Sequence, residues 1–193
     1  TLFRSPPTKL LLVVPCYNEE EILSKTHRVL QEYCNRLATE GVISSESRVC
    51  FVNDGSRDRT WQLIEEICQK DPKSIGVKLS RNFGHQSAIL AGLMHHAADF
   101  DCFVTIDADL QDPPSLIGRL IKTWEESGAD VVLAKRSDRA SDSAAKRFSA
   151  AAFYDMHNWV SQIKIPANVG DCRLMTRMVV DALKQLPEKQ RFM

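Results

Sequence analysis

The chain has 193 residues, enough for one α/β domain that buries a substantial core without disulfides or structural metals. Lysine plus arginine equals aspartate plus glutamate at 25 each, so no basic field indicates nucleic acid as a partner. The six cysteines never form a C-x-x-C pair, which argues against a zinc site and a disulfide framework and predicts buried thiols. No signal peptide or apolar run of about 18 residues is present, so we expect a soluble chain.

The predicted secondary structure alternates strand and helix along most of the chain. Residues 1–8 contain a Pro-Pro pair and are expected to form a disordered lead-in, followed by a single domain over residues 9–193. Apolar runs bounded by turn residues predict five strands, and helical spacing follows each of the first four. This alternation predicts an α/β fold with a doubly wound, mostly parallel sheet and helices on both faces. The expected strands cover residues 9–15, 48–53, 74–79, 102–106 and 129–134.

The part of the chain after residue 134 has a different character. A polar stretch that is basic at its start covers residues 135–143. It is followed by an expected amphipathic helix over residues 144–162, a further edge strand over 168–175 and a last helix over 176–186. We expect the choice of an acceptor to be made by this second part, residues 135–193.

Two carboxylates follow the fourth predicted strand. Asp107 and Asp109 lie two residues apart, so in extended backbone they project to the same side, and Gln111 adds an amide oxygen to that row. Hard oxygen ligands at this spacing suit Mg²⁺ or Mn²⁺. The alternative is that both are ordinary turn residues. Since two crowded carboxylates repel unless a cation lies between them, we favour the metal site.

Polar side chains also follow the other predicted strands. In a doubly wound sheet the carboxyl ends of the strands share one edge, and ligands bind outside that edge. The sequence therefore predicts a ligand site there, built from Tyr17, Asn18, Glu19, Asp54, Arg81, Asn82, Lys135 and Arg136.

Several common motifs are absent. No G-x-G-x-x-G follows a strand, no G-x-x-x-x-G-K-[ST] loop occurs, and there is no G-x-S-x-G elbow. These absences argue against a dinucleotide dehydrogenase, a P-loop enzyme and a Ser-His-Asp hydrolase. With no glycine-rich phosphate cradle, a cation held by Asp107 and Asp109 would have to neutralise a phosphate-rich substrate.

Four ordered motifs resemble those of the inverting family-two glycosyltransferases, which have the Rossmann-like GT-A fold. They are VPCYNEEE (14–21), NDGSRDRT (53–60), SRNFGHQ (80–86) and DADLQDPP (107–114). Two later segments, VLAKRSDR (132–139) and NVGDCRLM (168–175), resemble the polyprenyl-phosphate branch, with bactoprenol glucosyltransferases and dolichyl-phosphate mannose synthases. The resemblance covers nearly the whole chain. This sequence departs from it at His85-Gln86, where many relatives carry Lys-Glu, and at Cys172, where an aromatic residue is common.

The resemblance implies that residues 9–134 form the nucleotide-sugar-binding half of the domain and residues 135–193 the acceptor-binding half. Asp107 would contact the ribose and the metal, while Asp109 and Gln111 would hold Mg²⁺ or Mn²⁺ on the diphosphate. The other implied nucleotide-sugar contacts are Pro15, Tyr17, Glu19, Asp54 and Arg81.

On the acceptor side, the resemblance implies that Arg136 and Arg139 bind the acceptor phosphate, with Lys135 and Arg173 as helpers. Asp171 corresponds to the base of such enzymes, so the implied catalytic residues are Asp109, Asp171 and Arg136. A phosphate monoester has a second pKa of about 6, so at neutral pH the acceptor has no proton that must be removed. The alternative role for Asp171 is to orient Arg173 or to balance local charge.

The resemblance therefore implies metal-dependent, inverting transfer of a hexose, with glucose from UDP-glucose favoured, to undecaprenyl phosphate at the cytoplasmic face of the plasma membrane. GDP-mannose or a UDP-aminosugar is the alternative donor, and a catalytically silent nucleotide-binding domain is the alternative class. That branch usually continues into membrane segments, which are absent from this chain. Association into a homo-oligomer is also compatible with it, through the helix over 144–162. A processive enzyme is disfavoured, since no Q-x-x-R-W motif occurs.

Overall fold

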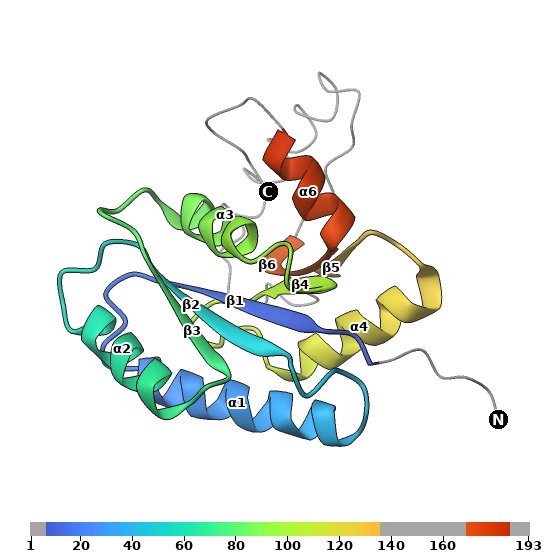
Figure 1. Cartoon of the computed structure of the whole chain (residues 1–193), viewed down its shortest axis with the longest axis horizontal. Helices are drawn as coiled ribbons and strands as arrows, with labels where there is room; N and C mark the ends of the chain where they lie inside the picture. The colour runs from blue at the N-terminus through green and yellow to red at the C-terminus, as the bar shows by residue number, and fades with distance from the viewer. Residues whose placement is uncertain (1–6, 136–168, 186–193) are drawn as a thin grey trace, which may run out of the picture.

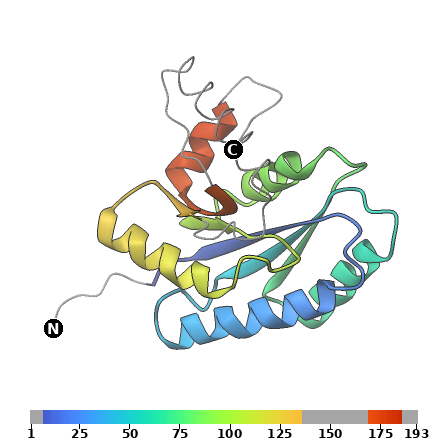
Figure 2. The same cartoon turned by 180° about the vertical axis from the view of Figure 1, so that it is seen from behind.

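A computed structural model describes residues 7–135 and 169–185 of the chain (Figures 1 and 2). Strands and helices alternate as expected from the apolar runs and their turn residues, and the five strands predicted up to residue 134 are all present. In chain order the elements are β1 (Leu10–Cys16), α1 (Leu23–Thr39), β2 (Arg48–Asn53), α2 (Thr60–Lys70), β3 (Ser74–Lys78), α3 (His85–His95), β4 (Cys102–Thr105), α4 (Ser115–Ser127), β5 (Val131–Lys135), β6 (Val169–Thr176) and α6 (Arg177–Gln185).

The strands form a six-stranded sheet in the order β3-β2-β1-β4-β6-β5. Strands β1 to β4 pair in parallel, whereas β6 runs antiparallel to both of its neighbours. The mostly parallel α/β sheet is thus confirmed, but the prediction that residues 168–175 form an edge strand is wrong. Strand β6 lies inside the sheet because Cys172 and Leu174 are buried on one face and Met175 on the other. The edge strand on this side of the sheet is β5, where Val131 and Leu133 are exposed.

Helices cover both faces of the sheet, with α1, α2 and α4 on one side and α3 and α6 on the other (Figure 1). Alternate residues of β1 serve the two cores. Leu10 and Leu12 belong to the cluster under α1 and α4, and Leu11 and Val13 to the cluster under α3 and α6. All seven residues of β1 are buried, as expected for a continuous apolar run at the centre of a parallel sheet.

Helix α3 lies unusually close to the sheet. A Cβ atom at Gly92 would come within 2.7 Å of Val13 and 2.8 Å of Val52, so only glycine fits without displacement. The close approach at Gly92 therefore holds the body of α3 next to β1 and β2.

None of the six cysteines, all within the described ranges, forms a disulfide, and four of them are buried. Burial raises the pKa of the Cys50 and Cys102 thiols to about 12, so these thiols act as small apolar groups. Thr8, expected in the lead-in, pairs with Ile43 in an isolated β-bridge. Within the described part of the chain, no helix has the length and apolar character needed to cross a membrane.

Candidate active site

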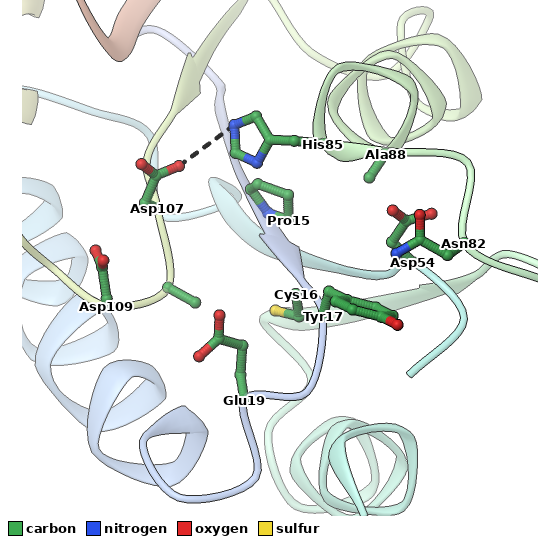
Figure 3. A pocket seen from close by; sticks show the side chains of 11 residues that line it. Pro15, Cys16, Tyr17, Glu19, Asp54, Asn82, His85, Ala88, Asp107 and Asp109 are labelled. Carbon is green, nitrogen blue, oxygen red and sulfur yellow. Dashed lines mark ion pairs between the residues drawn. The ribbon is translucent and has the colours of Figure 1, made fainter. Parts of the chain in front are cut away.

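A cleft of about 370 Å³ lies at the carboxyl edge of β1, β2 and β4, where the sequence predicted a ligand site (Figure 3). Most of the expected donor-side residues line it, together with a few that were not assigned a role. The lining residues are Pro15, Cys16, Tyr17, Glu19, Asp54, Asn82, His85, Ala88, Asp107, Ala108 and Asp109.

The loops after β1 and β2 are joined by hydrogen bonds between side chains and backbone. Asn18 has a left-handed φ of 57°. Its backbone N–H donates to Ser56 Oγ at 3.0 Å, and its side-chain Oδ1 accepts from the backbone N–H of Arg57 at 2.9 Å. Glu19 N donates to Thr60 Oγ1 at 2.8 Å. The two loops therefore form one wall of the cleft, which places Tyr17 and Glu19 at its rim.

Asp54, at the end of β2, fixes the segment that precedes α3. Its two carboxylate oxygens accept the backbone N–H groups of Phe83 at 2.8 Å and Gly84 at 2.9 Å, and the residue is only 3% exposed. Gly55 allows the same segment to approach, since a Cβ there would lie 2.3 Å from the carbonyl carbon of Arg81. Asp54 lines the cleft as expected, and it also holds residues 81–84 in place, a role that the sequence motif did not reveal.

Arg81 is not among the residues that line the cleft. Its guanidinium carbon lies 4.2 Å from the centre of the Phe83 ring, on which it stacks. The neighbouring Asn82 lines the cleft instead, beside Asp54 (Figure 3). The sequence placed both residues at the predicted ligand site, and the resemblance implied the donor contact for Arg81, but only Asn82 lines the cleft.

Asp107 and Asp109 lie in a turn and not in extended backbone. Strand β4 ends at Thr105, Leu110 has a left-handed φ of 54°, and Leu110 N donates to Asp107 O at 3.2 Å. The predicted projection from one side of an extended segment is therefore wrong. The turn nevertheless brings both carboxylates to the cleft, with Asp107 facing His85 (Figure 3).

Gln111 holds Asp109 from outside the cleft. Its side-chain Nε2 donates to Asp109 Oδ2 at 2.7 Å and its backbone N to Oδ1 at 3.1 Å. Gln111 is exposed and is not among the lining residues. In this arrangement Gln111 orients Asp109 through its amide nitrogen. The sequence had instead predicted that the amide oxygen of Gln111 would be a metal ligand.

The cleft is strongly acidic. Burial raises the pKa of Glu19, and the charges of Asp109, Asp58 and Asp107 raise it further. A divalent cation between these carboxylates would relieve the repulsion, and their hard oxygen atoms suit Mg²⁺ or Mn²⁺. The residues present therefore fit the expected metal. Within residues 7–135 and 169–185, no three His, Cys, Asp or Glu side chains are already arranged to hold an ion.

The expected acceptor side is described only in part. Arg173 in β6 is 9% exposed and stands in register with Thr105 and Leu133, so it is a buried residue of the sheet. Because β6 runs antiparallel to β4, Asp171 comes two residues further toward the acidic turn. Lys135 ends β5 opposite Val169 at the same edge.

Arg136 and Arg139, which were expected to bind the acceptor phosphate, lie outside the described residues, as does the helix expected over 144–162.

The fold and the cleft define an α/β protein with an acidic cleft at the carboxyl edge of its sheet, lined by carboxylates that suit a divalent cation. The family model described as "Glycosyl transferase family 2" matches residues 11–184. The chain belongs to this family.

Similar curated proteins include the "Prophage bactoprenol glucosyl transferase homolog" of Escherichia coli (strain K12) and the "Bactoprenol glucosyl transferase" of Shigella phage SfX. Each is 44% identical over 185 residues, which is 96% of this chain and 58% of the relative. The chain therefore spans less than two thirds of the length of these relatives.

Solved structures with the same fold include two glycosyltransferase complexes. The mannosyltransferase PcManGT from Pyrobaculum calidifontis, with GDP-Man and Mn²⁺, has a TM-score of 0.63 at 17% identity, over 94% of this chain and 48% of that one. Glucosyl-3-phosphoglycerate synthase from Mycobacterium tuberculosis, with Mn²⁺, UDP-glucose and phosphoglyceric acid, has a TM-score of 0.59 at 18% identity, over 89% and 58%. The expected GT-A fold is confirmed.

Proposed function

We propose that this chain is the catalytic domain of an inverting, metal-dependent enzyme that transfers glucose from UDP-glucose to a polyprenyl phosphate. Membership of glycosyl transferase family 2 supports sugar transfer. The similarity to proteins named bactoprenol glucosyl transferase supports glucose and a polyprenyl-phosphate lipid as the two substrates. A lipid acceptor implies work at a membrane surface, and we assign it to the cytoplasmic face.

One observation carries the proposal most directly: the cleft has a polar, partly aromatic end and an acidic end. Tyr17, Asp54 and Asn82 lie together at one end, and Asp107 and Asp109 lie at the other (Figure 3). A nucleoside diphosphate has the complementary order, with a planar base that stacks and hydrogen-bonds, followed by phosphates that need a cation.

At the nucleoside end, Tyr17 is 41% exposed and offers a ring face to a base. Asp54 Oδ1 accepts the N–H of Phe83 and Oδ2 accepts the N–H of Gly84. Each carboxylate oxygen can accept a second hydrogen bond. Asp54 can therefore accept one more hydrogen bond from a ligand without releasing residues 81–84.

At the acidic end, Asp107 and Asp109 would hold Mg²⁺ or Mn²⁺, with Gln111 orienting Asp109. The bound cation supplies charge stabilisation to the nucleoside diphosphate as it leaves. Without a cation, the negative charges of Glu19, Asp107 and Asp109 would repel the phosphates of the donor. The residues of the cleft are therefore suited to a donor that arrives together with its cation.

On the acceptor side, we propose that Arg136 and Arg139 bind the lipid phosphate, with Lys135 beside them. The burial of Arg173 favours support of the sheet over direct contact with the phosphate. A phosphate monoester has a second pKa of about 6 and is largely a dianion at neutral pH, so it can attack without losing a proton. Asp171 then has two candidate roles, as a base or as the residue that orients the cationic groups.

The first experiment is thermal unfolding of the chain with UDP, GDP or CDP, each with and without Mn²⁺. A ligand that binds only the native state raises the apparent stability by about 2.7 kcal/mol at a hundredfold excess over its dissociation constant. We expect stabilisation by UDP together with Mn²⁺ and none by CDP. Stabilisation by GDP alone would indicate a mannose donor, and no stabilisation by any nucleotide would contradict the proposal in favour of a silent domain.

The second experiment measures glucose transfer to a polyprenyl phosphate. Asp109→Ala should lower turnover by about three orders of magnitude, as expected when a group that stabilises the leaving charge is lost. Asp171→Asn should lose less if Asp171 only orients its neighbours, and as much if it is a base. Near-normal transfer by Asp109→Ala with Mg²⁺ present would overturn the metal assignment.

A further inference from the structure

We propose that His85 is a positioning residue for the cation site, and that its imidazole holds the Asp107 carboxylate in the orientation that binds the ion. The inference deepens the proposed function and rests on it. Nε2 of His85 lies 3.5 Å from Oδ1 of Asp107, and the two side chains are 42% and 26% exposed (Figure 3). His85 belongs to α3, whereas Asp107 follows β4, so the contact joins two separate elements at the mouth of the cleft.

The position of His85 is fixed by its backbone surroundings. His85 is the first residue of α3, and Gly84 before it has a φ of 94°, which favours glycine. Asp54 binds the N–H of Gly84, and Gly92 keeps the body of the helix close to the sheet. The imidazole therefore stands on a rigid support, as a residue must if it is to orient another side chain.

Asp107 lies among other carboxylates, and their like charges repel it. It follows the end of β4 in a turn, and it shares the cleft with the carboxylates of Glu19, Asp54 and Asp109. Of the described residues that line the cleft, His85 is the only basic one. A neutral imidazole with its proton on Nε2 presents an N–H to the Asp107 carboxylate, so in that tautomer an attractive contact does not require the charged ring.

Outer partners of this kind orient the groups that bind a metal. Removing such a partner typically costs about 10- to 100-fold in metal affinity, because the ligand is then free to adopt other rotamers. His85 would therefore act on cation binding and, through it, on the donor. This role differs from nucleobase recognition, which we assign to the opposite end of the cleft.

The test measures Mn²⁺ affinity in the presence of UDP, by electron paramagnetic resonance of the free ion during a titration. His85→Ala should weaken Mn²⁺ binding about 10-fold or more. His85→Gln places an amide nitrogen the same number of bonds from the backbone, and it should stay within about 3-fold of the wild type because it keeps an N–H donor. The matched control is His95→Ala, an exposed histidine at the other end of α3, which should leave the affinity unchanged.

A second comparison tests whether His85 acts through Asp107. In an Asp107→Asn background, the change His85→Ala should have little further effect on Mn²⁺ affinity, because contacting residues are not additive. Thermal unfolding of every variant without ligand separates lost metal binding from lost folding. A direct ¹⁴N coupling from His85 to bound Mn²⁺ would make it a metal ligand and overturn the positioning role.

The outcomes distinguish this inference from the proposed function. If the wild-type chain binds Mn²⁺ and UDP together, and His85→Ala binds both equally well, the positioning role is wrong while the proposed function stands. If the folded wild-type chain binds neither, both are wrong.

Discussion

The side chain of Asp54 offers the most direct test of how the cleft is built. The structure predicts that Asp54→Ala releases the segment before α3, because both carboxylate oxygens accept backbone N–H groups, at 2.8 Å from Phe83 and 2.9 Å from Gly84. A residue that only contacts a nucleotide could be replaced with little change in the stability of the ligand-free chain. Asp54 is 3% exposed, so its replacement should affect folding itself.

The expected magnitude follows from the two hydrogen bonds. Hydrogen bonds to a charged group contribute about 1.5–3 kcal/mol each. Phe83 is exposed, so water can partly replace the lost acceptor at its N–H, and the total should fall to about 2–4 kcal/mol. At about 2–4 °C per kcal/mol for a chain of this size, the midpoint of thermal unfolding should fall by roughly 5–15 °C. Asp54→Asn keeps one oxygen acceptor and should lose about half as much.

The assay is thermal unfolding of the ligand-free chain, followed by circular dichroism at neutral pH. The control is Asp99→Asn, which removes an exposed carboxylate 3.7 Å from His96 and should change the stability by less than about 0.5 kcal/mol. A fall of less than about 2 °C for Asp54→Ala would refute the reasoning, since the two hydrogen bonds would then contribute almost nothing.

Three further predictions concern stability. Burial raises the pKa of Asp71, but hydrogen bonds, led by those from His27 and Ser74, outweigh it and lower that pKa below 3.8. Their stabilisation is present above about pH 4 and declines as the pH falls through the lowered pKa. Asp71→Asn should therefore cost about 1–3 kcal/mol at pH 7 and progressively less as the pH falls below about 4 in denaturant titrations, and a loss independent of pH would contradict this. Gly92→Ala should destabilise the fold by about 1 kcal/mol or more, although alanine has the better helix propensity. Gly118→Ala should not, because its nearest contact, at 2.8 Å, is the hydroxyl at the far end of the Tyr33 side chain, and Leu37 lies at an ordinary 3.5 Å. Equal effects of the two changes in urea unfolding would contradict the close packing of α3. Burial and nearby carboxylates raise the pKa of Glu19, so the charged form of Glu19 destabilises the fold above that pKa. Glu19→Gln should therefore raise the midpoint of thermal unfolding by roughly 1–3 °C at pH 8 and by less at pH 4. A lower midpoint than that of the wild type at pH 8 would contradict the repulsion.

Much of the fold could be predicted because local patterns determine it. The apolar run of β1 is continuous, and a strand buried on both faces needs that pattern whatever lies around it. The alternation of strands and helices then restricts the sheet to parallel pairing with its ligand site at the carboxyl edge. The motifs that follow β1, β2 and β4 were expected to meet there, and Tyr17, Glu19, Asp54, Asp107 and Asp109 do line one cleft.

The placement of β6 could not be predicted in the same way. Its sequence, VGDCRLMT, has no long apolar run like that of β1, and nothing local indicates which strands it pairs with. Its insertion between β4 and β5 depends on contacts between residues far apart in the chain, such as Thr105 with Arg173. The same insertion buries Arg173, which the sequence had suggested as a helper in phosphate binding.

The sequence by itself thus determined the class of fold, the edge that carries the site and the carboxylates suited to a cation, because these depend on periodicity and residue type along short segments. Only the tertiary structure decided how the side chains are used. It placed Asp107 and Asp109 in a turn and bound Asp54 to the backbone at the start of α3. It also brought Asn82, and not Arg81, to the cleft, and His85 to Asp107. The physical reason is that each of these roles is a contact between elements, and such contacts depend on distances that only the packed chain defines.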